Sequence, residues 1–234
     1  MLLTDHILFL DGEAIIIDKP SGLPVDPPRD GSLSLANHLD SLKFGFQRWP
    51  NAVHRLDRDT SGCLLLSRNP KAHARFQQTF EAGTVVKHYI AVVDGVPEGD
   101  AGEITLPLGK FSTEEDGWRM IVDENGKAAH TAWEKLSLIG NRAVLRFIPK
   151  TGRTHQIRAH ALYGLGMAIV GDPVYGSGEI KPAYAAPEML LHSAFLSIPR
   201  ANKPPVEAKA PLPARFAAAG VVLADEPADE PLSD

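Results

Sequence analysis

The chain has 234 residues, is 44% hydrophobic and 23% charged, and carries a net charge of -5 and one cysteine, Cys63. This composition is typical of a soluble globular protein, and the sequence contains no run of about 18 apolar residues that could span a membrane. The single cysteine excludes an internal disulfide and a cysteine-rich zinc site. No basic region precedes an apolar one at the N-terminus, so we expect no secretory signal and predict a cytoplasmic protein.

The first elements predicted along the chain are a buried strand, a helix and a second strand. Residues 14–18, Ala-Ile-Ile-Ile-Asp, have the continuous apolar character of a buried strand. Leucines spaced three to four positions apart predict a helix over residues 33–42, with Ser32 as its N-cap. The apolar run over residues 62–67 predicts the second strand.

Another helix and strand are expected next. Asn69 is predicted to cap a helix that has Pro70 at its first position and closes at Gly83. Residues 87–93 alternate as in a strand, with Tyr89 on the same face as the apolar residues two and four positions later.

The remaining chain is predicted to be rich in strands. Strand-like runs alternate with turns between residues 103 and 148, and an Asn-Gly pair at 125–126 suggests a hairpin. A helix is expected over residues 154–163 and a strand over residues 189–198. Because strands outnumber helices and short turns join many of them, we predict a mixed α/β (α+β) domain with a central, largely antiparallel sheet and flanking helices.

Residues 222–234 are predicted to form a disordered acidic tail after a domain that spans residues 1–221. The tail contains five acidic residues, two prolines and no lysine or arginine. Without it the chain has equal numbers of acidic and basic residues, 24 of each. A neutral body still allows a local basic face that binds nucleic acid.

The densest cluster of charge lies just before the second predicted strand. The run from His54 to Asp59 contains five ionisable groups, which are costly to bury beside apolar residues unless they are paired. Asp57 lies between Arg55 and Arg58, and positive charge stabilises an ionised carboxylate that could act as a nucleophile or general base at a sugar carbon. The simpler alternative is an aspartate that caps a turn and pairs with an arginine.

Two other interpretations of this segment have less support. Asp57 and Asp59 could belong to an aspartyl phosphotransfer motif, but Thr60 comes one position too early and no apolar strand precedes them. A glycosidase would need two acids that face each other across the scissile bond, and nothing else in the sequence indicates one.

A second charged segment covers residues 150–160. Thr154 could cap a helix that opens with His155, and Arg158 would then lie one turn further along the same face. Two arginines near a helix N-terminus make a site for a phosphate or for the Asp57 carboxylate, although a solvated basic helix end is the simpler alternative. His155 and His160 are five positions apart, which does not suit two metal ligands on one helical face, so no metal site is expected.

Tyr89 is most simply a core residue of its strand. In a functional interpretation, its ring would stack on a base or its phenol would move a proton. The glycine-rich segments at 164–166 and 171–176 match neither a phosphate-binding loop nor a dinucleotide fingerprint, so no nucleotide cofactor is expected.

Taken together, these segments resemble the RluA family of RNA pseudouridine synthases over about residues 10 to 216. The order and separation of the shared motifs make the resemblance specific. The motifs are Asp18-Lys19-Pro20-Ser21-Gly22, His54 to Leu66, Lys87 to Val93, Thr151 to His160, Gly171 to Gly176, and Leu190-Leu191-His192-Ser193. The resemblance implies the pseudouridine synthase fold with an RNA-binding cleft. It also implies a reaction without metal or cofactor, in which the N1–C1′ bond breaks, the uracil turns and C5 joins C1′.

The resemblance further implies roles for individual residues. Asp57 would be the catalytic aspartate, Arg158 would pair with it and hold it ionised, and Tyr89 would stack on the uracil or remove its C5 proton. Arg55 would enter the RNA stack where the target uridine has flipped out. Other substrate contacts are expected from His54, Arg58, Lys150, Arg153 and, beneath the base, Leu190 or Leu191.

The sequence therefore predicts a monomeric pseudouridine synthase that acts on a structured RNA, either rRNA or tRNA. No S4-type RNA-binding module precedes the first predicted strand, so we expect substrate choice to depend on the catalytic domain itself. The rival hypothesis is a protein that keeps this fold but binds or folds RNA without catalysis. The intact set of Asp57, Tyr89 and Arg158 argues against it.

Overall fold

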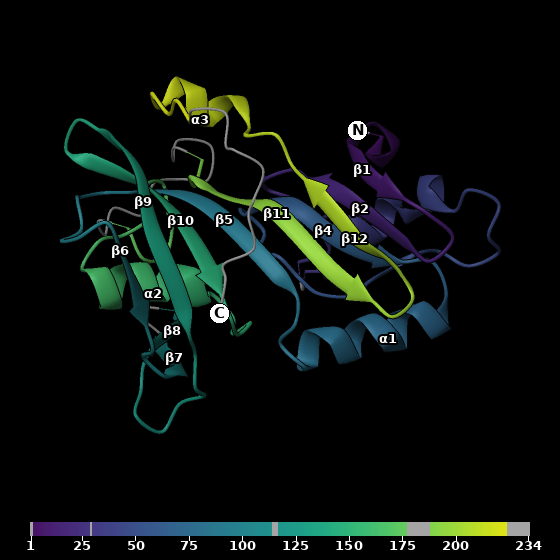
Figure 1. Cartoon of the computed structure of the whole chain (residues 1–234), viewed down its shortest axis with the longest axis horizontal. Helices are drawn as coiled ribbons and strands as arrows, with labels where there is room; N and C mark the ends of the chain where they lie inside the picture. Colours follow the sequence, from purple (N-terminus) through teal and green to yellow (C-terminus); the bar gives the residue numbers. More distant parts are fainter. Residues whose placement is uncertain (1, 29, 114–116, 177–187, 224–234) are drawn as a thin grey trace.

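A large, mostly antiparallel sheet organises the chain in the computed structural model, which describes residues 2–28, 30–113, 117–176 and 188–223 (Figure 1). Within these residues ten strands form one sheet, in the order β1-β2-β4-β11-β5-β10-β9-β6, with β12 paired to β11 and β3 paired to β4. These strands are β1 (Ile7–Leu10), β2 (Ala14–Lys19), β3 (Asn51–Ala52), β4 (Ser61–Ser67), β5 (Val86–Val93), β6 (Ala101–Ile104), β9 (Thr131–Ile139), β10 (Arg142–Pro149), β11 (Leu191–Arg200) and β12 (Lys203–Lys209).

A separate two-stranded sheet and five short helices complete the described chain. Strands β7 (Leu108–Thr113) and β8 (Gly117–Val122) pair with each other. The helices are the 3-10 helices η1 (Leu3–His6) and η2 (Leu35–Leu42) and the α-helices α1 (Pro70–Glu81), α2 (Gln156–Leu165) and α3 (Ala214–Ala218).

The two halves of the large sheet meet where β4 pairs with β11, the one parallel ladder among the described strands. Gly62 lies opposite Ser193 at this seam and has a φ of 106°. A Cβ atom at position 62 would lie 2.2 Å from the Ser193 carbonyl oxygen. Only glycine combines this backbone conformation with so close an approach of the two strands.

In the N-terminal half, β2 and β4 are buried on both faces, as their continuous apolar sequences require. Ile15 and Ile17 pack with the leucines of η2, whereas Ile16 packs with Phe76 of α1 on the opposite face. The Asn69 side chain accepts a hydrogen bond from the Ala72 N–H at 2.9 Å, so the predicted cap of α1 is confirmed.

In the C-terminal half, α2 and the small sheet β7–β8 pack together (Figure 1). Met120 of β8 shares a buried cluster with Ala159 of α2 and with Tyr175. On the other face of the large sheet, Phe216 of α3 packs with Ile90 of β5. This arrangement leaves α2 and the seam between β4 and β11 as the elements that position the candidate site.

The predicted class, a mixed α+β domain with a mostly antiparallel sheet, is confirmed, and so are most of its elements. The confirmed elements are the strands expected over 14–18, 62–67, 87–93 and 189–198 and the helix that begins at Pro70. The helix predicted over 33–42 is also present, as the 3-10 helix η2, but its predicted N-cap is wrong. The N-cap is Ser34 rather than Ser32, and the Ser34 N–H donates to the Asn37 side chain at 2.9 Å.

Two further expectations also need correction. The Asn-Gly pair at 125–126 forms a turn after β8, but it does not connect the paired strands β7 and β8, which both precede it. Helix α2 begins at Gln156, with His155 rather than Thr154 at the N-cap. Most of the predicted acidic tail, residues 224–234, lies outside the described residues. Among the helices described here, none is long and apolar enough to cross a membrane.

Candidate active site

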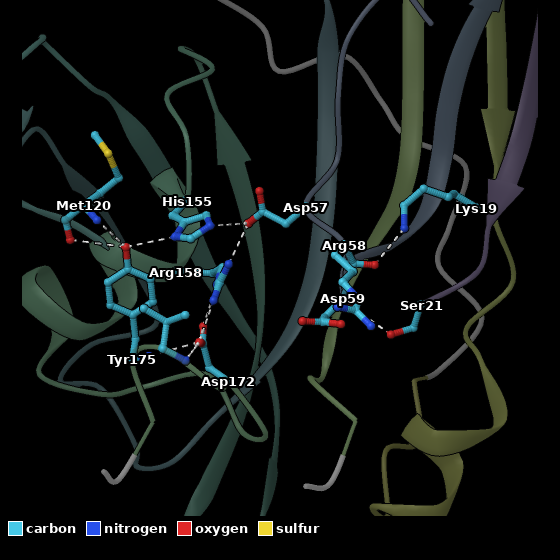
Figure 2. A network of polar contacts seen from close by, with 11 residues as sticks. Lys19, Ser21, Asp57, Arg58, Asp59, Met120, His155, Arg158, Asp172 and Tyr175 are labelled. Atoms are coloured by element: carbon cyan, nitrogen blue, oxygen red, sulfur yellow. Dashed lines mark hydrogen bonds and ion pairs between the residues drawn. The ribbon is translucent and has the colours of Figure 1, made fainter. Parts of the chain in front are cut away.

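Asp57 occupies the turn between β3 and β4, at the seam of the two half-sheets. Its carboxylate accepts a hydrogen bond from the Arg158 guanidinium at 2.9 Å, and 19% of its side chain is exposed (Figure 2). Arg158 comes from the first turn of α2 and lies 101 positions away in the sequence. The contact predicted between these two residues is therefore present in the structure.

Arg158 is held from its other side by Asp172. The guanidinium makes a two-pronged contact with this carboxylate, at 2.7 Å through Nε and 2.8 Å through Nη2. Asp172 is completely buried and also accepts the backbone N–H groups of Val174 and Tyr175. This geometry leaves Nη1 of Arg158 directed at Asp57 and fixes its orientation.

The two carboxylates keep the guanidinium charged. Burial lowers the pKa of Arg158, but the hydrogen bonds and charge of Asp172, and then those of Asp57, outweigh burial and raise the pKa above its ordinary value. A permanently charged partner therefore faces the Asp57 carboxylate.

His155 approaches the same oxygen of the Asp57 carboxylate as Arg158 does. Its Nε2 atom is 3.8 Å from Asp57 Oδ2, and its Nδ1 atom is 3.1 Å from the Tyr175 hydroxyl (Figure 2). Burial lowers the pKa of His155 to about 4, although the Asp57 charge acts in the opposite direction. The imidazole is therefore neutral at pH 7, and Arg158 supplies the positive charge beside Asp57.

The backbone of His155 is strained, because its φ of 50° lies in the left-handed region. Gln156, which is buried, holds this turn in place. Its side-chain oxygen accepts hydrogen bonds from the Thr151 hydroxyl and the Arg153 N–H, and its side-chain nitrogen donates to the His130 carbonyl and to Thr131. Strain at a residue beside a reactive group, maintained by neighbouring hydrogen bonds, is typical of functional sites.

Asp57, Arg158 and His155 line a cavity of about 620 Å³ that includes an open mouth. Apolar side chains supply part of the wall, namely Leu56, Tyr89, Ile157 and Leu191. The cavity therefore combines flat apolar surface with one carboxylate and its charged partner.

Tyr89 is buried in the wall of this cavity, on β5. It lies directly opposite Ser193 of β11. Burial raises the pKa of the Tyr89 phenol, although the Ser193 side chain acts in the opposite direction, so the phenol is neutral at pH 7. The Ser193 hydroxyl donates to the Cys63 carbonyl at 3.4 Å across the seam of the sheet.

Basic side chains surround the mouth of the cavity. Arg55 and Arg153 line it and are exposed to solvent. Arg55 also makes an ion pair with Asp26 at 2.6 Å. Burial lowers the pKa of Lys87, another lining residue, to about 8, so its ammonium remains mostly charged at pH 7.

Lys19 supports the turn that carries Asp57. It is fully buried, and its ammonium donates to the backbone carbonyls of Pro20, Leu23 and Arg58 at 2.8 to 3.0 Å. Burial lowers the pKa of Lys19 to about 7. One ammonium thus ties the segment from Pro20 to Leu23 to the turn that carries Asp57, and Figure 2 shows its contact with the Arg58 carbonyl.

Not every residue predicted to bind substrate lies at the cavity. Contrary to the prediction for His54, its imidazole is stacked on Phe80 and accepts the Leu65 N–H at 3.0 Å, so its polar group supports β4. Leu190 packs in the core on the other face of the sheet, and of the two leucines only Leu191 lines the cavity.

Arg58 and Lys150 are exposed but do not line the cavity. Their predicted contacts with RNA would have to lie beyond its mouth, and they stay predictions.

No local pattern in the sequence singles out three residues that support the site, Lys19, Gln156 and Asp172. Each is a polar residue inside a motif shared with the resembling family, and each is buried. Their motifs were the available signal, but their partners are distant in sequence.

Comparison with known proteins identifies similar chains. A family model described as RNA pseudouridylate synthase matches residues 13–163. An RNA pseudouridine synthase of Zymomonas mobilis, itself uncharacterized, is 54% identical over 92% of this chain and 97% of its own. The ribosomal large subunit pseudouridine synthase C of Rickettsia felis is 37% identical over 81% of this chain. This chain covers only 61% of that relative's length.

The fold also has solved counterparts. The structure titled human RNA pseudouridylate synthase domain containing 4 superposes with a TM-score of 0.76 and 26% identity, over 93% of this chain and 92% of that one. A second human structure, domain containing 1, gives a TM-score of 0.73 and 28% identity over 88% of this chain.

Proposed function

Because the chain belongs to the RNA pseudouridylate synthase family, we propose that it isomerises specific uridines of a structured RNA, rRNA or tRNA, to pseudouridine. The observation that carries this proposal is the chain of contacts from Asp172 through Arg158 to Asp57 at the wall of the cavity. It presents one oriented carboxylate to a space that is open to a flipped nucleotide.

In the proposed reaction Asp57 starts the glycosidic exchange. The N1–C1′ bond of the flipped uridine breaks, the uracil turns within the cavity, and a C5–C1′ bond forms. C5 then loses its proton and N1 gains one, so the product is an isomer of the substrate. Arg158 stabilises the ionised carboxylate, because its orientation is set before the substrate arrives.

Tyr89 and Leu191 are proposed to hold the uracil while it turns. Both lie in the apolar part of the wall, where rotation of the flat uracil ring costs little interaction energy. We also propose that the Tyr89 phenol takes part in proton transfer at C5, because Tyr89 lines the same cavity as Asp57.

Basic residues at the mouth are proposed to bind the RNA backbone. Arg55 and Arg153 are exposed and line the cavity, so they can contact phosphates on either side of the flipped nucleotide. We propose that Arg55 leaves Asp26 and fills the gap in the RNA stack. The protein is proposed to act in the cytoplasm as a monomer.

The experiment that tests this function is a comparison of pseudouridine maps. Ribosomal and transfer RNA from cells with and without the gene would be mapped at single-nucleotide resolution. We expect one or a few uridines to lose the modification without the gene and to regain it when the wild-type gene, but not an Asp57→Asn variant, is returned. Unchanged maps would instead favour an RNA-binding protein without catalysis.

A further inference from the structure

Trp118 is an exposed aromatic residue next to the candidate site. It lies on β8 with 37% of its surface exposed, and its ring is nearly perpendicular to that of His155 at a centroid distance of 4.8 Å. His155 in turn reaches to 3.8 Å from the Asp57 carboxylate. A single imidazole ring therefore separates Trp118 from the reactive group.

A lysine accompanies this tryptophan. The ammonium of Lys110, on the paired strand β7, lies 5.7 Å from the centroid of the Trp118 ring. Lys110 is exposed, and a cation–π contact is weak at a solvated position. The lysine can therefore leave the ring for a stronger partner, such as a phosphate.

The strand that carries Trp118 is anchored at Met120, and this anchor fixes the position of the pair of Trp118 and Lys110. Met120, two residues after Trp118 and on the same face of β8, is buried against α2. The backbone N–H of Met120 donates to the Tyr175 hydroxyl at 2.9 Å, and this hydroxyl also contacts His155. The position of Trp118 is thus tied to the same network that surrounds Asp57.

We propose that Trp118 and Lys110 form a stacking site for an unpaired RNA base that flanks the flipped uridine. The base would stack on the indole ring and displace the Lys110 ammonium, which would then pair with the phosphate of the same nucleotide. This inference rests on the proposed function, because it assumes that RNA occupies the neighbouring cavity. To the proposed function it adds a second recognition site, which holds a nucleotide outside the cavity.

Charge favours RNA over a protein partner at this place. The exposed side chains at the neighbouring mouth include Arg55 and Arg153, and Lys87 adds a partly buried ammonium. Aromatic rings among basic groups are the usual surface for single-stranded nucleic acid. A binding partner with a carboxylate-rich surface would be attracted as well, and the experiment below separates the two.

Trp49 provides a matched control. It is 58% exposed and has the Lys43 ammonium 5.3 Å from its ring centroid, but its indole N–H is bound to Asp40 and it is absent from the cavity. The two tryptophans thus offer the same chemistry at different places. The third tryptophan, Trp133, is buried and serves as a constant background in fluorescence.

The test is binding of a fluorescein-labelled oligouridylate of ten nucleotides to the full chain, measured by anisotropy. We expect Trp118→Ala to weaken binding about 5- to 100-fold, the range for loss of one stacked base, and Trp118→Phe to retain most of it. Trp49→Ala should bind within two-fold of wild type. Unlabelled oligomer should quench tryptophan emission in the Trp49→Phe variant but not in Trp118→Phe.

Several results would overturn the proposal. These are a Trp118→Ala variant that binds within two-fold of wild type, an equal loss in Trp49→Ala, or a wild-type chain that does not bind the oligomer. Thermal unfolding of each variant separates loss of binding from loss of fold. If the alanine variant is unstable, the quenching comparison between Trp49→Phe and Trp118→Phe decides, and equal quenching in the two would also overturn the proposal. Since binding needs no turnover, this result is independent of the test of the Asp57 activity.

Discussion

Replacing Asp172 with asparagine removes one charge from a buried site and leaves its shape almost unchanged. The Asp172 side chain is completely buried, and both of its oxygens bind the Arg158 guanidinium, at 2.7 and 2.8 Å. An asparagine keeps an oxygen that can accept the two backbone N–H groups, but it turns an NH₂ group toward the guanidinium. Removing one partner of a buried ion pair typically costs about 3–5 kcal/mol.

We therefore expect the Asp172→Asn variant to lose about 3–5 kcal/mol of unfolding free energy. For a chain of this size, that loss corresponds to a fall of roughly 6–20 °C in the melting temperature. Urea unfolding monitored by circular dichroism measures the free energy. Pseudouridine formation should also fall by a larger factor than stability explains at a temperature where the variant is folded, because Arg158 loses the partner that orients it toward Asp57.

Asp94→Asn is the matched control, since Asp94 pairs with Arg142 in an ion pair whose side chains are both about half exposed. A solvent-exposed pair contributes about 0–1 kcal/mol, so this variant should be close to wild type. If Asp172→Asn were also within about 1 kcal/mol of wild type and fully active, Asp172 would not be the support of Arg158, and the reasoning would be refuted.

Three other substitutions test the framework around the site. Lys19→Met leaves three backbone carbonyls, one of them in a fully buried hydrogen bond, without their donor, so we expect it to lower the unfolding free energy by at least about 2 kcal/mol in urea titrations; an unchanged value would contradict the proposed support. Gly62→Ala places a Cβ atom 2.2 Å from the Ser193 carbonyl oxygen, so little folded protein is expected by circular dichroism, and a normally folded variant would show that the seam can open. His54 accepts the Leu65 N–H, and burial lowers its pKa to about 3, below the value near 6.5 of the unfolded chain. Its contribution to stability is therefore full above about pH 6.5 and is lost as the pH falls toward 3, by about 1.4 kcal/mol per pH unit. His54→Gln should have a shallower loss between pH 7 and 5, and equal slopes would exclude this role.

Local patterns predicted those elements that depend on nearby residues. The cap at Asn69 with Pro70 beside it predicted helix α1, because both effects act within the first turn. The apolar run at 14–18 predicted β2, since a strand buried on both faces has no other composition. By contrast, the predictions of the N-caps of η2 and α2 were wrong, because each depended on a single polar residue. The observed N-caps are Ser34 and His155.

The pairing of distant segments could not be predicted from local patterns. Local patterns offer the Asp57 carboxylate only as one of two anions for the basic helix end. The resemblance to a family makes the contact between Asp57 and Arg158 specific, since 101 positions separate the two residues. The parallel ladder between β4 and β11 was not expected at all. The choice between Leu190 and Leu191 depends on strand parity, because successive side chains point to opposite faces. The left-handed backbone of His155 had no local signal, because only the buried Gln156 and its partners maintain it.

The central claim is that Asp57 is the reactive carboxylate of this site. Its most direct test is the incubation of the purified wild-type protein, Asp57→Asn and Asp59→Asn with ribosomal and transfer RNA from cells that lack the gene. The control Asp59 is in the same turn but does not line the cavity. After digestion to nucleosides, pseudouridine would be separated by chromatography and counted. We expect new pseudouridine with wild type and Asp59→Asn, and none with Asp57→Asn, which should still bind the RNA. Turnover by Asp57→Asn at a rate near wild type would contradict the account.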